Sequence, residues 1–386
     1  MSLKEILEVN EINRESPIGL WKSLIETPDL MREELSEGLR YISAQYPPDA
    51  AEIVMNAACQ FDCHHCIYPK DYPKFNKNLE LRVWKEIFKG LYERLGFRTF
   101  VFGGRGLNKD TLEAVEYLKG FDDTKVGFIA DGPQMERFLS QILESPADWI
   151  DVSVDGMAEQ HDTQRKSPGS FYRSVEVLEK LLGYGRTPMV AILSTITTIN
   201  QESLLEMVEY LNKIGLSNFH ITPVGILDNY RPSPNLRPSQ DDFNNLIDEF
   251  KREYQNLRDS FIMFHIASGR YIRYLKDGKP EMYHTMKADG KQLLWSEELN
   301  NNEFHVSITP SSLTASREFI INSNGDVITA EVVGMGKIPD QYIFGDAHQM
   351  MATYKNRDRF FRHYVQLPVF DFYIGKLMQE RGILRS

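Results

Sequence analysis

The sequence contains few cysteines. Only three occur in 386 residues, and all of them lie within eight positions, at Cys59, Cys63 and Cys66. An odd number of cysteines confined to one short stretch cannot form the disulfide framework of a small secreted protein. Three thiolates this close together are instead suited to binding one soft metal centre. The C-x3-C-x2-C segment is therefore a candidate metal site.

The chain also lacks an excess of basic residues and long apolar runs. It has 44 Lys and Arg against 55 Asp and Glu, which gives a formal net charge of −11. Because non-specific nucleic-acid binding needs a basic surface, we expect no nucleic-acid partner. No apolar run approaches the roughly 20 residues that span a bilayer, and the charged N-terminus is unlike a signal peptide. We expect a cytoplasmic protein in a reducing compartment, with no membrane partner.

The composition is otherwise that of an ordinary globular protein, 42% hydrophobic and 26% charged, in a chain long enough to bury a large core. Residues 1–50 are predicted to be mostly helical. Ser2-x-x-Glu5 resembles a capping box, and Thr27-Pro28 places a cap residue before a first-turn proline. We interpret this segment as a helical extension that packs on the main domain. A peptide-binding or lid function is the alternative.

Residues 51–230 alternate short apolar strands with helices. Six such units predict an α/β fold with a parallel sheet covered by helices, wound by right-handed crossovers into a full or partial (β/α)6 TIM-like barrel. Active-site residues of such folds lie at the carboxyl ends of strands, and the cysteine segment, Gly103-Gly104, Asp131-Gly132 and Asp155-Gly156 all follow predicted strands. The predicted strands are 52–56, 98–102, 126–130, 149–154, 189–196 and 218–222, and the predicted helices are 79–95, 109–121, 135–144, 170–184 and 202–214.

Beyond residue 230 the pattern is less regular. Residues 231–317 are interpreted as a loop and helical connection, with a helix over 240–259, a strand over 261–266 and otherwise irregular structure over 260–315. Two apolar runs flank Asn324-Gly325, which predicts a β-hairpin. Residues 318–386 would then form a small α+β C-terminal extension.

The cysteine segment directly follows the first predicted strand. A [4Fe–4S] cluster usually takes four cysteine ligands, so three cysteines would leave one iron open. The alternatives are three buried cysteines, or a zinc site completed by His64 or His65. A structural zinc site usually pairs two separated C-x2-C units, and this sequence has no second unit. We therefore favour the cluster.

This spacing after a first strand resembles that of the radical S-adenosylmethionine (SAM) enzymes, in which the open iron chelates the amino and carboxylate groups of SAM. The resemblance covers residues 50–230 well and 318–350 faintly. It implies one [4Fe–4S] cluster bound by the three cysteines, SAM as a cofactor, and an electron donor such as flavodoxin or ferredoxin.

Other segments resemble SAM-binding motifs of this family. Phe102-Gly103-Gly104-Arg105-Gly106 resembles a Gly-Gly-Glu run that receives the SAM amino group, but Arg105 stands where the family has an acid, and arginine offers no acceptor. The segment from Asp151 to Phe171 resembles one in the SPASM-type branch, where a serine and an arginine, here Ser153 and Arg165, hold the SAM carboxylate, a pairing that suits their chemistry. The remaining positions at which the family contacts SAM are His65 at the adenine, Asp131 at the ribose, and Thr195, Thr197, Asn200 and Pro223-Val224 at the adenine and ribose.

The C-terminal hairpin resembles the scaffold of a SPASM extension. Asn324-Gly325-Asp326 and Gly345-Asp346 carry this resemblance, while Ala330 stands where family members place an auxiliary-cluster cysteine. We interpret the segment as a degenerate, cluster-free extension that closes the barrel and shapes the substrate pocket. The chain is then expected to work with a single cluster.

The resemblance implies reductive cleavage of SAM and abstraction of hydrogen from an organic substrate by a 5′-deoxyadenosyl radical. We expect a ribosomal peptide precursor or another natural-product intermediate as the substrate. One alternative is a radical lyase or mutase that acts on a sugar, nucleotide or amino acid. Another is a catalytically silent homologue that binds a metal or SAM as a partner protein, which the departure at Arg105 leaves open. The sequence identifies no catalytic residue.

Overall fold

The computed structural model describes most of the chain. The described residues are 16–27, 30–46, 48–56, 58–66, 78–103, 106–185, 188–225, 233–316, 318–328, 345–354, 357, 360–361, 373, 376–378 and 380–381.

The strands are β1 (Ala50–Ile53), β2 (Thr99–Phe102), β3 (Lys125–Asp131), β4 (Trp149–Ser153), β5 (Met189–Ile196), β6 (Asn218–Pro223), β7 (Phe261–Ile266), β8 (Lys287–Asp289), β9 (Gln292–Leu299), β10 (Asn302–Ile308), β11 (Glu318–Ile321), β12 (Asp326–Ile328) and β13 (Gly345–Asp346). The α-helices are α2 (Pro17–Glu26), α3 (Arg32–Gln45), α4 (Leu81–Leu95), α5 (Lys109–Leu118), α6 (Gly132–Arg137), α7 (Leu139–Glu144), α8 (Ala158–Arg165), α9 (Ser170–Gly183), α10 (Leu204–Lys213), α11 (Gln240–Glu253), α12 (Gly269–Gly278), α13 (Pro280–Thr285) and α15 (Ala347–Thr353).

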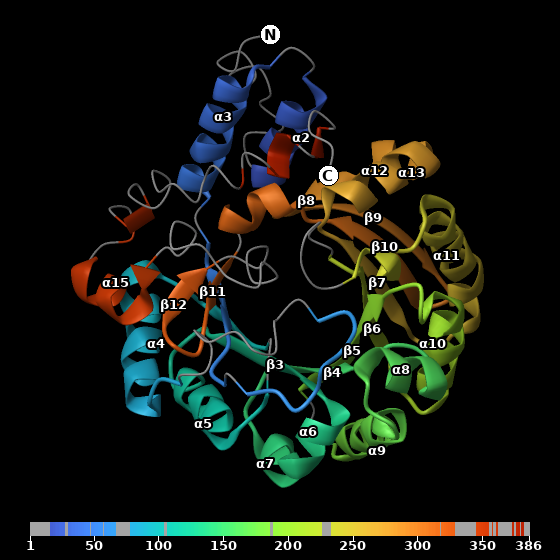
Figure 1. Cartoon of the computed structure of the whole chain (residues 1–386), viewed down its shortest axis with the longest axis horizontal. Helices are drawn as coiled ribbons and strands as arrows, with labels where there is room; N and C mark the ends of the chain where they lie inside the picture. The colour runs from blue at the N-terminus through green and yellow to red at the C-terminus, as the bar shows by residue number, and fades with distance from the viewer. Residues whose placement is uncertain are drawn as a thin grey trace.

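These strands form one sheet in the order β13-β12-β11-β1-β2-β3-β4-β5-β6-β7-β10-β9-β8. Neighbouring strands from β11 through β10 are parallel, and antiparallel strands extend the sheet at both ends. The sheet curves around a central space, and helices α4 to α11 follow its outer side (Figure 1). Because the end strands β13 and β8 do not pair within the described part of the chain, the predicted partial TIM-like barrel is confirmed.

The strands owe their two faces to alternation along the sequence. In β6, the fully buried Phe219 and Ile221 alternate with the less buried His220 and Thr222. Because successive side chains of a strand point to opposite faces, one set packs beneath the helices and the other faces the central space. The same alternation gives β4 an inner face that carries Asp151 and Ser153.

The N-terminal helices lie where the sheet remains open (Figure 1). Helix α2 packs against β8 and the 3-10 segment Ser311–Ser316. Two polar contacts join these parts of the molecule: Ser16 Oγ donates to the Gly290 carbonyl oxygen across 3.0 Å, and Lys291 Nζ lies 2.9 Å from Asp49 Oδ1. No helix in the described residues has the length and apolar character that crossing a membrane would need.

Two parts of the predicted secondary structure are wrong. Thr27 does not cap the start of a helix but follows the end of α2 as its C-cap. Residues 260–315 are not irregular, because they contain β7 to β10, α12 and α13. The strand predicted over 261–266 is present as β7, and β10 pairs with it in parallel. The apolar alternation of β10 is confined to Phe304, Val306 and Ile308, while His305 and Ser307 on its other face mask the strand pattern.

Candidate active site

The cysteine loop follows β1 and is held over the carboxyl ends of the strands by three segments. The His64 amide donates to the Gln164 carbonyl oxygen of α8 across 2.8 Å, and the Gly106 amide donates to the Ala58 carbonyl oxygen across 3.2 Å. From α6, Gln134 Nε2 lies 3.9 Å from the Cys59 sulfur. Cys63 is buried, whereas Cys59 and Cys66 are half-buried. The loop is thus fixed at several points by contacts with the rest of the chain.

Glycine is required where the segment after β2 meets this loop. A Cβ on Gly106 would come within 2.6 Å of the Ala58 carbonyl oxygen, far closer than van der Waals contact. A Cβ on Gly103 would meet only ordinary contacts, the nearest being Ile129 Cδ1 at 3.6 Å. Gly104 and Arg105 lie outside the described residues. Close approach of backbone to backbone is therefore found at Gly106, the last residue of the motif, and not at Gly103.

Asp155, just beyond the end of β4, is the polar centre of the site. Its side chain is fully buried, and its Oδ2 lies 2.7 Å from Arg165 Nη2. Its Oδ1 accepts a hydrogen bond of 2.7 Å from the Thr195 amide of β5. Burial alone would raise the pKa of Asp155, but the Arg165 guanidinium holds it below its ordinary value. Asp155 is therefore a buried carboxylate anion.

Arg165, the last residue of α8, is predicted to bind the SAM carboxylate. Its side chain is 9% exposed, and its Nε has no hydrogen-bond partner in the described part of the chain. Burial alone would lower its pKa, but Asp155 holds the pKa above the ordinary value. A buried N–H group without an acceptor costs about 1–3 kcal/mol. The Nε edge of this guanidinium is therefore suited to receive an anion.

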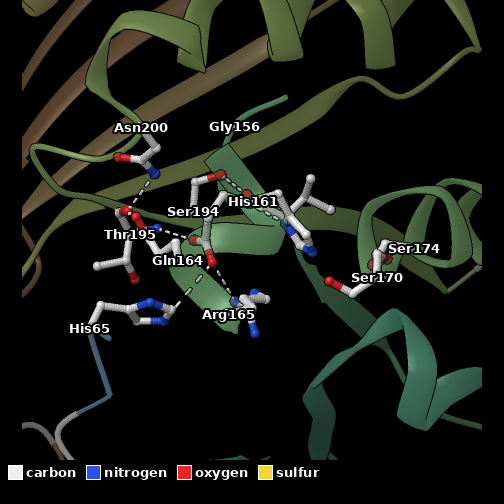
Figure 2. A network of polar contacts seen from close by, with 12 residues as sticks. His65, Gly156, His161, Gln164, Arg165, Ser170, Ser174, Ser194, Thr195 and Asn200 are labelled. Carbon is white, nitrogen blue, oxygen red and sulfur yellow. Dashed lines mark hydrogen bonds and ion pairs between the residues drawn. The ribbon is translucent and has the colours of Figure 1, made fainter. Parts of the chain in front are cut away.

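His65 reaches the same carboxylate from the cysteine loop. Its Nε2 lies 4.0 Å from Asp155 Oδ2, and its Nδ1 is buried without a hydrogen-bond partner in the described residues. Burial lowers the pKa of His65 to about 4, so the imidazole is neutral. Figure 2 shows His65, Arg165 and Thr195 turned toward one another from the cysteine loop, α8 and β5.

Two amide side chains hold the end of β5. Gln164 Nε2 and Asn200 Nδ2 both donate to the Thr195 carbonyl oxygen, across 2.9 and 2.8 Å (Figure 2). The Gln164 side chain also accepts a hydrogen bond from the Thr197 hydroxyl. Because the Gln164 carbonyl binds His64, this residue connects the cysteine loop with β5.

The other predicted SAM contacts lie at neighbouring strand ends. Asp131 and Ser153 are paired across β3 and β4. Asp131 Oδ1 accepts a 2.9 Å hydrogen bond from the Gln134 amide and so caps α6. Burial raises the pKa of Asp131 to about 6 against the opposing charge of Arg165. Val224 is 1% exposed, and its amide donates to the Ile196 carbonyl oxygen across 3.0 Å, which places it beside the end of β5.

Asp155, Gln134 and Gln164 are site residues that the sequence motifs did not indicate, whereas Asn200 was predicted to lie at the adenine and ribose. Asp155-Gly156 was noted because it follows a strand and lies in the segment that resembles the SPASM-type branch. In the structure Gly156 adopts a φ of 94°, and a Cβ there would lie 2.5 Å from Ser203 Oγ. A glycine forced by this conformation fixes the backbone immediately after the carboxylate.

The donor set can be tested against an iron–sulfur cluster. Burial raises the pKa of Cys63 to about 12, with Arg165 opposing and the sulfurs of Cys66 and Cys59 contributing to the increase. Cationic iron would relieve this repulsion, since metal binding deprotonates thiols. No three Cys, His, Asp or Glu side chains in the described ranges are placed to share a single ion. A [4Fe–4S] cluster does not require three side chains on one ion, because each thiolate binds a different iron. These residues fit the cluster.

The fold is an open parallel barrel with a loop of three cysteines after its first strand. Beside that loop lies Arg165, whose buried Nε–H group can donate to an anion. Residues 53–214 match the model of the Radical SAM superfamily. This part of the chain therefore belongs to the radical SAM superfamily, which implies a [4Fe–4S] cluster and SAM as its cofactors. No curated protein matches it.

Several solved structures are similar to this chain. That of anSMEcpe with bound AdoMet has a TM-score of 0.56 and 16% identity, covering 81% of this chain and 82% of the other. Streptococcus suis SuiB has a TM-score of 0.56 and 12% identity, covering 92% and 76%. SuiB bound to its precursor peptide SuiA has a TM-score of 0.57 and 12% identity, covering 88% and 71%. At these identities the likeness establishes the shared fold.

Proposed function

We propose that this enzyme binds its cluster through Cys59, Cys63 and Cys66, cleaves SAM reductively, and abstracts hydrogen from a peptide substrate. The observation that carries the assignment of the SAM site is the buried, unpartnered Nε of Arg165, beside the cysteine loop. The SAM carboxylate would supply the acceptor that this N–H group lacks. When bound, the cluster supplies the electron that cleaves SAM to methionine and a 5′-deoxyadenosyl radical.

The residues of the chain hold and enclose this site. Arg165 and Ser153 would bind the SAM carboxylate, because a guanidinium and a hydroxyl both donate to it. Gly103 and Gly104 would offer carbonyl oxygens to the amino group, and His65 would lie against the adenine. Asp131, Thr195 and Val224 would line the ribose and adenine side. Since Cys63 and Arg165 are buried, water would be largely excluded from the reacting bond.

A ribosomal peptide precursor is the substrate class that we favour. Support comes from SuiB, a solved structure of the same fold, which is bound to its precursor peptide SuiA. We propose that residues 318–386 form a degenerate SPASM-like extension over the 51–230 core, joined by residues 231–317. No cysteine follows Cys66, so this extension would bind no auxiliary cluster through cysteine. A flavodoxin or ferredoxin would supply the electron, in the cytoplasm.

The SAM site is tested by binding and by product formation. The anaerobically reconstituted enzyme is expected to form 5′-deoxyadenosine from SAM and dithionite. Arg165→Gln should bind SAM about tenfold or more weakly, because a charge-assisted hydrogen bond is lost. Arg252→Ala is the matched control, since Arg252 pairs with Glu253 on the exposed face of α11. Unchanged SAM affinity in Arg165→Gln would overturn the assignment of the carboxylate site.

The substrate class needs its own experiment. Co-expression with short peptides encoded beside the gene, followed by mass spectrometry, should reveal a peptide whose mass changes only when the wild-type enzyme is present. A cysteine-loop variant is the control. If a sugar, nucleotide or amino acid is converted and no peptide is, the enzyme is a small-molecule lyase or mutase. A protein that binds cluster and SAM but makes no 5′-deoxyadenosine with any of them is the catalytically silent homologue.

A further inference from the structure

We propose that Asp155 is the positioning residue of the SAM site, acting through Arg165. The inference rests on the proposed function, in which Arg165 receives the SAM carboxylate. It goes beyond that function because it proposes that Asp155 orients Arg165, although Asp155 does not itself touch the cofactor. Three observations carry it: the geometry of the ion pair, the way in which Asp155 is itself fixed, and the segments that meet at it.

The ion pair leaves the Nε–H group of Arg165 available. Asp155 Oδ2 takes the Nη2 of the guanidinium at 2.7 Å, whereas the neighbouring Nε has no partner in the described residues. A guanidinium is planar and carries its five donors in a fixed fork. Holding Nη2 therefore fixes the direction in which the Nε–H bond points. Without Asp155, the long arginine side chain would lose the carboxylate that contacts its Nη2.

Asp155 is itself held at its carboxylate and its backbone. Its Oδ1 accepts from the Thr195 amide, and its own amide donates to His161 Nδ1 across 3.0 Å. Gly156 follows with its positive φ of 94°. Residues that orient a ligand must have their own rotamers fixed by packing and hydrogen bonds. Asp155 meets that requirement, because it is fully buried, its Oδ1 is hydrogen-bonded to the Thr195 amide, and its Oδ2 is ion-paired with Arg165.

Three cofactor-facing segments meet at this one carboxylate. Arg165 comes from the end of α8, Thr195 from β5, and His65 from the cysteine loop with its Nε2 at 4.0 Å (Figure 2). A buried pair that contributed only to stability would not need to contact the cluster loop and two predicted SAM contacts together. The arrangement indicates that Asp155 sets the relative positions of these three segments.

Asp155→Asn is the direct test. Asparagine can still accept from the Thr195 amide, but its neutral amide no longer attracts Arg165. We expect the iron and sulfide content to be unchanged and the affinity for SAM to fall about tenfold or more, as for other residues that orient a ligand. The electron paramagnetic resonance spectrum of the reduced cluster should change less on SAM addition than in the wild type. If Asp155→Asn yields too little folded protein, Asp155→Ser replaces it, with the same expected loss.

Asp151→Asn is the matched control. Asp151 is a buried carboxylate four residues earlier, 3.9 Å from His220 Nδ1, and no contact to Arg165 is found in the described residues. Its SAM affinity and spectrum are expected to match the wild type. A thermal midpoint lowered equally in both variants, with SAM affinity lost in both, would reduce Asp155 to a structural role and overturn the proposal.

A double-mutant comparison separates this proposal from the proposed function. If Asp155 acts through Arg165, adding Asp155→Asn to Arg165→Gln should weaken SAM binding no further, since coupled residues are non-additive. Fully additive losses would overturn the positioning role. If Arg165→Gln weakens binding and Asp155→Asn does not, the inference fails and the SAM site stands. If neither variant changes SAM affinity, the carboxylate site itself is elsewhere.

Discussion

Gly106 and Ala58 lie in backbone contact, with the Gly106 amide donating to the Ala58 carbonyl oxygen across 3.2 Å. The contact joins the segment after β2 to the cysteine loop. A Cβ at position 106 would come within 2.6 Å of that oxygen. The position of Cys59, one residue beyond Ala58, therefore depends on a glycine that contributes no side chain of its own.

Gly106→Ala is expected to displace the cysteine loop. The clash involves backbone, so the loop must move, and overpacking of this kind costs about 1–3 kcal/mol. Iron and sulfide per chain after reconstitution should fall, while circular dichroism shows the fold retained. Gly183→Ala at the end of α9 is the control, because a Cβ there meets nothing within 4 Å. Equal cluster content in the two variants would show that the contact does not position the loop.

Each cysteine of the loop is expected to be required for the cluster. Single Cys→Ala substitutions at 59, 63 and 66 should each prevent stable cluster binding, because no further cysteine exists in the sequence to replace the lost ligand. Iron and sulfide analysis after anaerobic reconstitution measures this, with SAM-dependent 5′-deoxyadenosine formation lost in parallel. One zinc per wild-type chain, with neither iron nor sulfide, would instead establish a zinc site.

Glu380 gives the stability of the protein a predictable dependence on pH. Its carboxylate oxygens accept hydrogen bonds from the Ser312 amide and hydroxyl and, across 3.0 Å, from Trp21 Nε1 of α2. Burial raises the pKa of Glu380 to about 7, although these hydrogen bonds and Lys376 oppose the increase. The folded state therefore holds a proton that the unfolded state releases near pH 4.5. Its contribution is greatest below that pH and is lost as the pH rises toward 7, by roughly 3 kcal/mol in all.

Urea unfolding between pH 5 and pH 8 measures this contribution. Glu380→Gln, which cannot ionise, should remove most of the fall in unfolding free energy over about pH 5–7. Glu281→Gln on the exposed face of α13 is the control and should keep the wild-type dependence. If Glu380→Gln also keeps it, the carboxyl of Glu380 does not hold the proton.

The repeating part of the fold is predictable from sequence because burial leaves a clear pattern. Strands covered by helices need apolar residues at alternate positions or throughout, as in β5 (Met189–Ile196), which begins and ends where predicted. Strands β8, β9 and β10 were missed because they lie at one end of the sheet and carry polar residues on one face. His305, for example, is 7% exposed and binds Ser296 and Glu303, and its ring packs on Phe261 of β7, with 4.7 Å between the ring centroids. That contact joins segments distant in sequence.

The sequence predicts which residues could bind the cluster and SAM. It predicts less well the contacts that orient those residues. The cysteine spacing is visible in the chain, and Ser153 and Arg165 are visible because the segment that contains them resembles a family motif. Asp155 is visible only as part of an Asp-Gly pair, which alone suggests a turn. Its partnership with Arg165, Thr195 and His65 depends on how α8, β5 and the cysteine loop meet in space. Local sequence patterns do not contain that information.

The account is tested most directly by SAM cleavage in the reconstituted wild-type enzyme and in Arg165→Gln, at matched iron and sulfide content. The wild type should produce 5′-deoxyadenosine with dithionite, and the variant should need about tenfold or more SAM to reach half its maximal rate. A variant with the same dependence on SAM concentration as the wild type would contradict the central claim that the buried Nε edge of Arg165 receives the cofactor.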